Sequence, residues 1–151
     1  FAVNLDADDK NWVEPDISVI CDKSKLTDRG CSGAPDWIIE ITSPSTQGHD
    51  YLKKLLLYQK HGVREYWIVN PSAKSVMVYD FEHGDSAGYS FDDQIPSAIY
   101  DFDLKAFAWI TLAFDVSRQL AIILSRQFDY TSSGTSWQGA YFLYPKPVHY
   151  N

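Results

Sequence analysis

Three side chains, Asp16, Glu40 and Lys54, have the types and the spacing to do chemistry together. Glu40 lies inside the apolar run 37–41, where a charged and unpaired carboxylate would cost several kcal/mol, so a partner is expected there. Asp16 begins another apolar run, and two carboxylates on neighbouring strands form the oxygen cage that Mg²⁺ or Mn²⁺ prefers. A bound divalent ion polarises a phosphoryl oxygen and activates water, while a nearby lysine stabilises the charge of the transition state. Both effects belong to phosphodiester hydrolysis.

Each of these residues also has a simpler structural interpretation. Asp16 could cap a turn after a proline, and Glu40 could form a structural ion pair with Lys54 or Arg64. Lys53 and Lys54 could form a solvated helix face. As a candidate for the catalytic lysine, Lys53 ranks second after Lys54, because it points about 100° away from Lys54 on a helix. The combined pattern, rather than any single residue, favours a metal-dependent nuclease site.

Other polar and aromatic side chains near this stretch have structural interpretations. His49 and His61 lie near a loop and a helix end, where surface or capping roles are expected rather than metal ligation. Glu65 could be an acid on the rim of the site. The pair Tyr66-Trp67 is expected in the core rather than as a platform on which bases stack.

A strand–loop–helix–strand unit of the βαβ kind must position the candidate acid and lysine. Residues 38–42 are typical of a buried strand, and a loop rich in Ser, Pro and Gly follows. Asp50 can cap an amphipathic helix over residues 51–61. Residues 66–69 form the next strand, and residues 75–81 alternate in polarity and can pair with it across a tight turn.

Two segments before this unit are expected to form an antiparallel hairpin. Residues 1–5 alternate between apolar and polar, and residues 12–21 form a second extended run after a polar turn. Pro15 has no N–H to donate, so the second strand starts, bends or lies at an edge there. Residues 22–34 are rich in Lys, Ser, Asp and Gly and are expected to form a loop.

The last third of the chain has a different character. Residues 86–100 predict a short edge strand and a loop, and the helical spacing of apolar residues over 106–124 predicts a helix. Residues 128–151 are aromatic and poor in charge and could be an apolar arm for a partner or a sequence not native to the domain. We therefore divide the chain into a core, residues 1–104, and a C-terminal helix and apolar tail of unknown role, residues 105–151.

Composition narrows the class of protein. The 151 residues suit one domain, and a hydrophobic fraction of 45% is enough for a core. The net charge of −7 argues against non-specific affinity for phosphates, although metal-binding carboxylates add to that count. Cys21 and Cys31 cannot complete a four-ligand zinc site, and a reduced, cytoplasmic protein is expected. No run of about 18 apolar residues occurs, so no membrane span is expected.

The N-terminus suggests a processed or truncated chain. It starts at Phe1 rather than Met, and no signal peptide precedes it. A cut sheet edge and an exposed apolar tail would both favour self-association, so a homo-oligomer is one expectation.

Four motifs, in order, resemble those of a known family. They are residues 13–20 (VEPDISVI), residues 33–45 (GAPDWIIEITSPS), Asp50 with Lys54 and Tyr58, and residues 62–67 (GVREYW). Each motif alone has low specificity, whereas four at these spacings are specific. The stretch 1–104 resembles the bacterial Uma-type family of restriction endonucleases, within the PD-(D/E)XK nuclease superfamily. The resemblance implies an α/β fold with a restriction-endonuclease-like core, in which helices flank a mixed central β-sheet.

The resemblance also implies roles for single residues. Asp16 and Glu40 become metal ligands, and the main-chain carbonyl of Ile41 becomes a further ligand. The superfamily lysine normally stands two residues after the acid, where this chain has Thr42, and Lys54 on the following helix takes that role. The implied function is a Mg²⁺- or Mn²⁺-dependent endonuclease that hydrolyses phosphodiester bonds in DNA, with Asp16, Glu40 and Lys54 as catalytic residues.

Two departures from the family pattern leave other functions open. The N-terminal region of the family, with a helix and often a further acidic residue, would lie before Phe1, and the tail after residue 104 has no counterpart. These departures and the acidic charge favour an alternative, a catalytically impaired or non-enzymatic interaction module that retains the nuclease fold. Hydrolysis of RNA or of another phosphoester is a third and weaker alternative.

Overall fold

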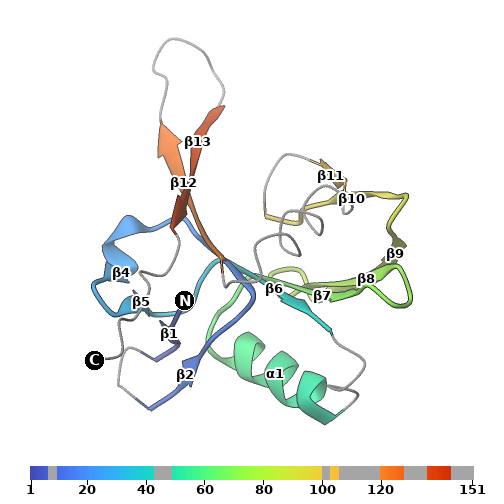
Figure 1. The fold of residues 1–151 in the computed structure, drawn as a ribbon, viewed down its shortest axis with the longest axis horizontal. Coiled ribbons are helices and arrows are strands. Elements are labelled where there is room, and N and C mark those ends of the chain that lie inside the picture. Colours follow the sequence, from blue (N-terminus) through green and yellow to red (C-terminus); the bar gives the residue numbers. More distant parts are fainter. Residues whose placement is uncertain (7–9, 43–48, 100–102, 106–119, 128–135, 144–151) are drawn as a thin grey trace, which may run out of the picture.

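The centre of the molecule is a seven-stranded mixed sheet (Figure 1). The computed structural model describes residues 1–6, 10–42, 49–99, 103–105, 120–127 and 136–143. The strands lie in the order β13 (Ser136–Leu143), β12 (Leu120–Gln127), β3 (Ile17–Ile20), β6 (Trp37–Ile41), β7 (Glu65–Asn70), β8 (Ser75–Asp80) and β9 (Asp85–Ser90). The pairs β12–β3 and β6–β7 are parallel, and the other pairs are antiparallel. This arrangement confirms the predicted α/β class with a mixed central sheet.

Helix α1 (His49–Lys60) connects the parallel strands β6 and β7. Parallel strands need such a crossover, because a tight turn cannot join them. The predicted helix over residues 51–61 is confirmed, but it begins at His49, so Asp50 lies in its first turn and not at the N-cap. Within the described part of the chain, no helix is long and apolar enough to cross a membrane.

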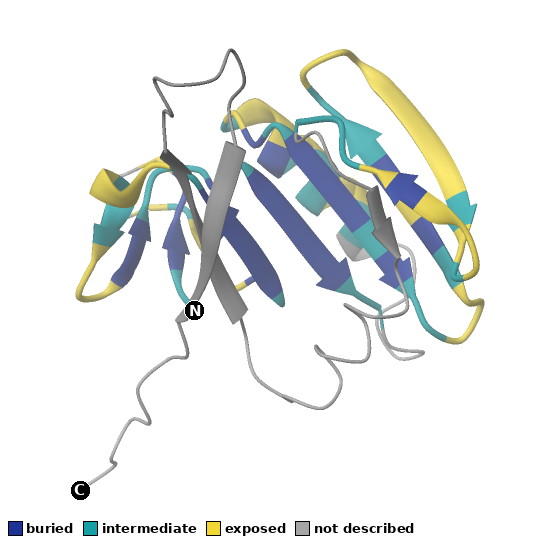
Figure 2. Ribbon diagram, turned by 90° about the horizontal axis from the view of Figure 1, so that it is seen from above, coloured by how far each residue is buried: buried dark blue, intermediate teal, exposed yellow. Residues whose placement is uncertain are grey.

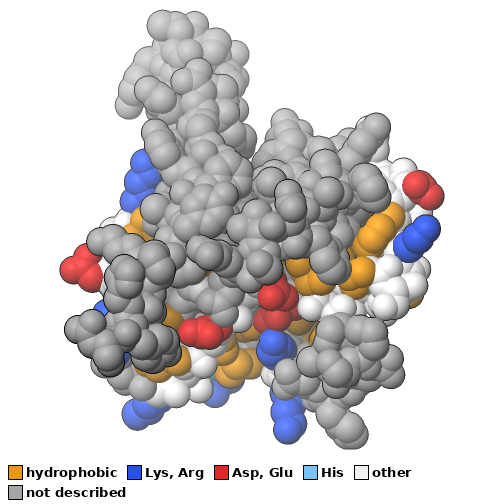
Figure 3. Space-filling model, in the orientation of Figure 1, with side chains coloured by type: hydrophobic (Ala, Val, Ile, Leu, Met, Phe, Trp, Pro, Cys, Tyr) orange, Lys and Arg blue, Asp and Glu red, His pale blue; other side chains and the backbone are white. Residues whose placement is uncertain are grey.

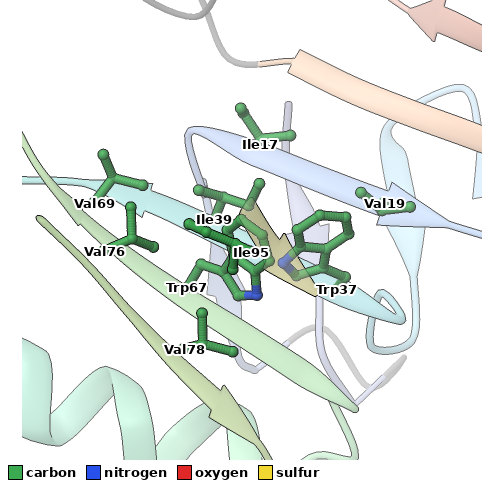
Figure 4. Packing of buried hydrophobic residues seen from close by; sticks show 9 residues of the cluster. All are labelled: Ile17, Val19, Trp37, Ile39, Trp67, Val69, Val76, Val78 and Ile95. Carbon is green, nitrogen blue, oxygen red and sulfur yellow. The ribbon is translucent and has the colours of Figure 1, made fainter. Parts of the chain in front are cut away.

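Buried side chains alternate between the two faces of the sheet, as the period of a strand requires. One cluster lies on the α1 side and contains Val3, Leu5, Ile20, Cys31, Ile38, Tyr58, Val63 and Tyr66. The opposite cluster, drawn in Figure 4, contains Ile17, Val19, Trp37, Ile39, Trp67, Val69, Val76, Val78 and Ile95. Figure 2 shows that burial is concentrated in the central strands, while much of β9 is exposed. The central strand β6 is therefore covered on both faces.

A second, four-stranded sheet is built from the N-terminal segments. Its order is β2 (Trp12–Val13), β1 (Val3–Asn4), β5 (Gly30–Ser32) and β4 (Leu26–Thr27). The predicted antiparallel pairing of the first two segments is confirmed for β1 and β2, but the expected strand 12–21 is split at Pro15, and its second half joins the large sheet as β3. The prediction of a loop over 22–34 was wrong, because a short 3₁₀ helix (Lys23–Lys25) and the β4–β5 hairpin lie there.

The C-terminal predictions had mixed outcomes. The pairing of residues 66–69 with 75–81 is confirmed by the β7–β8 hairpin, and the expected edge strand after residue 86 is confirmed as β9, followed by β10 (Gln94–Pro96). Strand β10 pairs with β11 (Asp103–Lys105). The helix predicted over 106–124 was wrong from Leu120 onward, where β12 lies, and residues 106–119 are outside the described part. The domain boundary at residue 104 stays a prediction.

Gly30 is required by the contact between the two N-terminal strands β1 and β5. Its φ is +137°, and an added Cβ would lie 2.0 Å from the carbonyl oxygen of Ala2. That oxygen accepts a hydrogen bond from the N–H of Cys31, so it cannot move without breaking the pairing. We expect Gly30→Ala to lower the free energy of unfolding by about 3 kcal/mol, measured by urea denaturation.

Gly62 provides the matched control for this substitution. It also has a positive φ, of +85°, but an added Cβ would meet nothing within 4 Å. Gly62→Ala should therefore lower the free energy of unfolding by about 1 kcal/mol, which is the cost of placing alanine at a positive φ. Equal losses in the two variants would contradict the steric argument for Gly30.

Candidate metal-dependent nuclease site

The central sheet brings the two predicted carboxylates near each other. Strands β3 and β6 are antiparallel, with Ile17 opposite Ile39 and Ser18 opposite Ile38. Asp16 directly precedes β3 and Glu40 directly follows Ile39 in β6, so the same register continued by one step would set the two acids opposite each other. Side chains alternate along a strand, so both acids lie on the face that α1 covers, together with Ile38.

Pro15 ends the hydrogen-bonded ladder at this point. The recorded pairing stops at Ile17 with Ile39, and Pro15, which would come opposite Ile41 if the register continued, has no N–H to donate. The N–H of Ile41 instead donates to Oδ2 of Asp16, at 2.7 Å. Because the N–H and C=O of one strand residue point to the same side, the Ile41 carbonyl also faces Asp16. The Pro-Asp sequence thus leaves a carboxylate and a main-chain carbonyl together at the end of β3.

Glu40 is held by two side chains of α1. Its side chain is buried, Oε1 accepts a hydrogen bond from the Tyr58 hydroxyl at 2.7 Å, and Oε2 lies 3.0 Å from Nζ of Lys54. Of the two ion-pair partners considered from the sequence, the structure selects Lys54, since Arg64 binds Glu82 and Asp36. The predicted site residues Asp16, Glu40, Ile41 and Lys54 are therefore brought together by three elements.

The electrostatics of the site follow from this burial. Burial raises the pKa of Glu40 above its usual range, while the hydrogen bond from Tyr58 and the charge of Lys54 oppose that shift, and the charge of Asp16 adds to it. Burial and the adjacent Glu40 raise the pKa of Tyr58, so its hydroxyl keeps its proton and acts as a donor. A further positive charge beside the two carboxylates would be favourable.

The helix explains why Lys54 reaches the acid and Lys53 does not. Residues 54 and 58 are four apart and share one face, whereas Lys53 lies on the exposed side. Tyr58 belonged to the sequence pattern, but its contact with Glu40 was missed. The spacing of Lys54 and Tyr58 is the signal that could have revealed it.

The donor set fits a hydrated divalent ion. Two carboxylates and one carbonyl are hard oxygen ligands, and Mg²⁺ is usually bound through one or two carboxylates while it keeps several waters. Each oxygen of an ionised carboxylate has two lone pairs, so one hydrogen bond at each Glu40 oxygen leaves room for a metal. The described residues contain no group of three or more His, Cys, Asp or Glu side chains that could hold a metal by themselves.

Some other sequence interpretations change in the structure. The prediction that Glu65 is a rim acid was wrong, because its side chain is fully buried on the face opposite α1. His61 has the expected capping role, with Nδ1 2.7 Å from the Leu57 carbonyl oxygen and Nε2 2.8 Å from Oδ1 of Asp6. The side chain of His49 lies outside the described part.

Acidic and basic side chains lie next to each other on the surface near the site. On the face shown in Figure 3, acidic side chains lie over β6, and Lys and Arg side chains lie beside them over α1. Elsewhere on this face, the basic side chains of the described residues lie as separate spots rather than as one patch.

Comparison with known proteins supports this description of the fold. A crystal structure of a protein from Anabaena variabilis, described as "a putative nuclease belonging to DUF820", is similar with a TM-score of 0.54 and 24% identity. The match covers 72% of this chain and 65% of that chain, so the chain spans less than two thirds of this relative. No curated protein matches the sequence. The sequence profile of the family Uma2, described as "Putative restriction endonuclease", matches residues 2–105, and the chain therefore belongs to the Uma2 family.

Proposed function

We propose that this chain is a Mg²⁺- or Mn²⁺-dependent endonuclease that hydrolyses phosphodiester bonds in DNA. The observation that supports it most is the buried Glu40 of β6, which lies 3.0 Å from Lys54 and next to Ile41, whose N–H donates to Asp16. Membership of the Uma2 family supports a nuclease-like function. The metal, the DNA substrate and the roles of single residues are our inference.

The proposed roles follow from the chemistry of each group. Asp16, Glu40 and the carbonyl of Ile41 would hold the ion, which would supply the charge that polarises the phosphate and activates water. Lys54 would orient the attacking water and stabilise the negative charge that grows on the phosphate. Its side chain is 31% exposed, so it can reach a substrate from its position beside Glu40.

A non-enzymatic module is the second candidate. Both oxygens of Glu40 have partners within the protein, so the buried charge is compensated by Lys54 and Tyr58 without an ion. Such a complete pair is what a fold that has lost its activity would retain. The net charge of −7 agrees with this alternative.

A cleavage assay with the whole chain separates the candidates. Supercoiled plasmid DNA and a single-stranded RNA of similar length are incubated with Mg²⁺, Mn²⁺, Ca²⁺ or EDTA. We expect the DNA to be nicked with Mg²⁺ or Mn²⁺ and to stay intact with EDTA. Intact DNA in every arm would support the module, and cleavage of RNA alone would replace the substrate in our proposal.

A further inference from the structure

The two oxygens of the Glu40 carboxylate have different surroundings. Oε1 accepts a hydrogen bond from Tyr58, whose side chain is fully buried, whereas Oε2 contacts Lys54, whose side chain is 31% exposed. The lysine has a flexible stem and can exchange its partner for water or for a phosphate. The tyrosine has no such freedom, so one oxygen is fixed and the other can change partners.

The position of Tyr58 is set by packing and by its helix. Its ring lies edge-on to Tyr66 of β7, with centroids 5.1 Å apart and an interplanar angle of 70°. Aromatic pairs favour this edge-to-face geometry. A Tyr58 side chain has few rotatable bonds, and this contact leaves its hydroxyl aimed at Glu40.

We propose that Tyr58 is a positioning residue, whose hydroxyl anchors Oε1 of Glu40 and so keeps the carboxylate oriented to bind a divalent cation. The inference rests on the proposed function, because it assumes that Glu40 is a metal ligand. Partners that hydrogen-bond a ligating carboxylate fix its orientation, and their loss typically weakens metal affinity 10- to 100-fold. Tyr58 touches neither a substrate nor a reacting atom in this description.

Tyr58 and Lys54 should have opposite effects on metal affinity. Removing the Tyr58 hydroxyl releases the carboxylate and should weaken binding. Removing the Lys54 charge takes away a cation that repels the metal and competes for Oε2, so binding should become tighter. A loss of affinity caused only by a looser α1 would instead appear in both variants.

The test measures Mn²⁺ binding to the whole chain by titration calorimetry, without DNA. For Tyr58→Phe we expect a Kd about 10-fold higher than that of the wild type, and for Lys54→Met a lower Kd. Tyr79→Phe is the matched control, because Tyr79 also packs on Tyr66, with centroids 6.1 Å apart, and its loss of a hydroxyl should leave the Kd unchanged. The wild type also gives a readout that needs no variant, since bound Mn²⁺ should broaden the NMR signals of the Tyr58 ring more than those of Tyr79.

The outcomes distinguish this inference from the proposed function. No Mn²⁺ binding by the wild type would overturn both. Binding by the wild type with an unchanged Kd in Tyr58→Phe would overturn the inference alone. Binding without broadening at Tyr58 would place the ion away from Glu40, since the Tyr58 hydroxyl lies 2.7 Å from Oε1, and would overturn both. A Kd raised equally in Tyr58→Phe and Lys54→Met would also overturn it, since both would then act through the packing of α1.

Discussion

We expect Glu40→Gln to lower the rate of Mg²⁺-dependent DNA cleavage by about 1,000-fold or more. Glutamine keeps the size of the side chain and can still accept a hydrogen bond from Tyr58. It removes the negative charge that would bind the metal, and it places an amide against the ammonium group of Lys54. The measurement is the initial rate of plasmid nicking at saturating Mg²⁺, compared with that of the wild type.

The exposed acid Glu82 provides the control for this substitution. The carboxylate of Glu82 pairs with the guanidinium of Arg64 rather than with a proposed ligand, so Glu82→Gln makes the same chemical change at a different ion pair. Its cleavage rate should match that of the wild type. Thermal unfolding of both variants separates a loss of activity from a loss of folded protein. A folded Glu40→Gln variant that cleaves at the wild-type rate would remove Glu40 from the site.

The central part of the fold could be predicted because its signals are local. The strand β6, the helix α1 and the hairpin β7–β8 each have a clear period and are separated by turn residues. Strand β12 was mistaken for a helix, because a short apolar run such as 120–124 satisfies either period. The hairpin β4–β5 was missed because its strands have only two and three residues and depend on pairing with β1, far away in the sequence.

The sequence motif was enough to identify the acidic residues of the site, but not their contacts. The motif selected Asp16 and Glu40, but only the pairing of β3 with β6 in the sheet brings them near each other. The contact of Tyr58 with Glu40 depends on how α1 packs on the sheet. Glu65 was misjudged because its hydrogen-bond donors Ser97 and Ile99 lie 32 and 34 residues later, beyond the reach of any local pattern.

Glu65→Ala should be the most destabilising of the substitutions considered for this fold. Oε1 accepts a hydrogen bond from Nε1 of Trp67 at 2.6 Å. Oε2 accepts from the hydroxyl of Ser97 at 2.8 Å and from the N–H groups of Ala98 and Ile99 at 3.1 and 3.3 Å. Alanine would leave these four donors without an acceptor and open a cavity. We expect the free energy of unfolding to fall by about 4 kcal/mol or more, measured by urea denaturation.

The buried position of Glu65 also determines whether the stability of the fold rises or falls with pH. Burial raises the pKa of Glu65 in the folded protein above its usual value of 4.5. The unfolded chain therefore loses this proton first, and stability falls as the pH rises from 4.5 through the raised pKa, then stays level. In Glu65→Gln this part of the pH dependence of stability should vanish. Glu82→Gln changes an exposed ion pair, so it should keep this pH dependence and lower the free energy of unfolding by at most about 1 kcal/mol. A Glu65→Ala variant as stable as Glu82→Gln would show that the three hydrogen bonds from Ser97, Ala98 and Ile99 do not hold the segment 97–99 to β7.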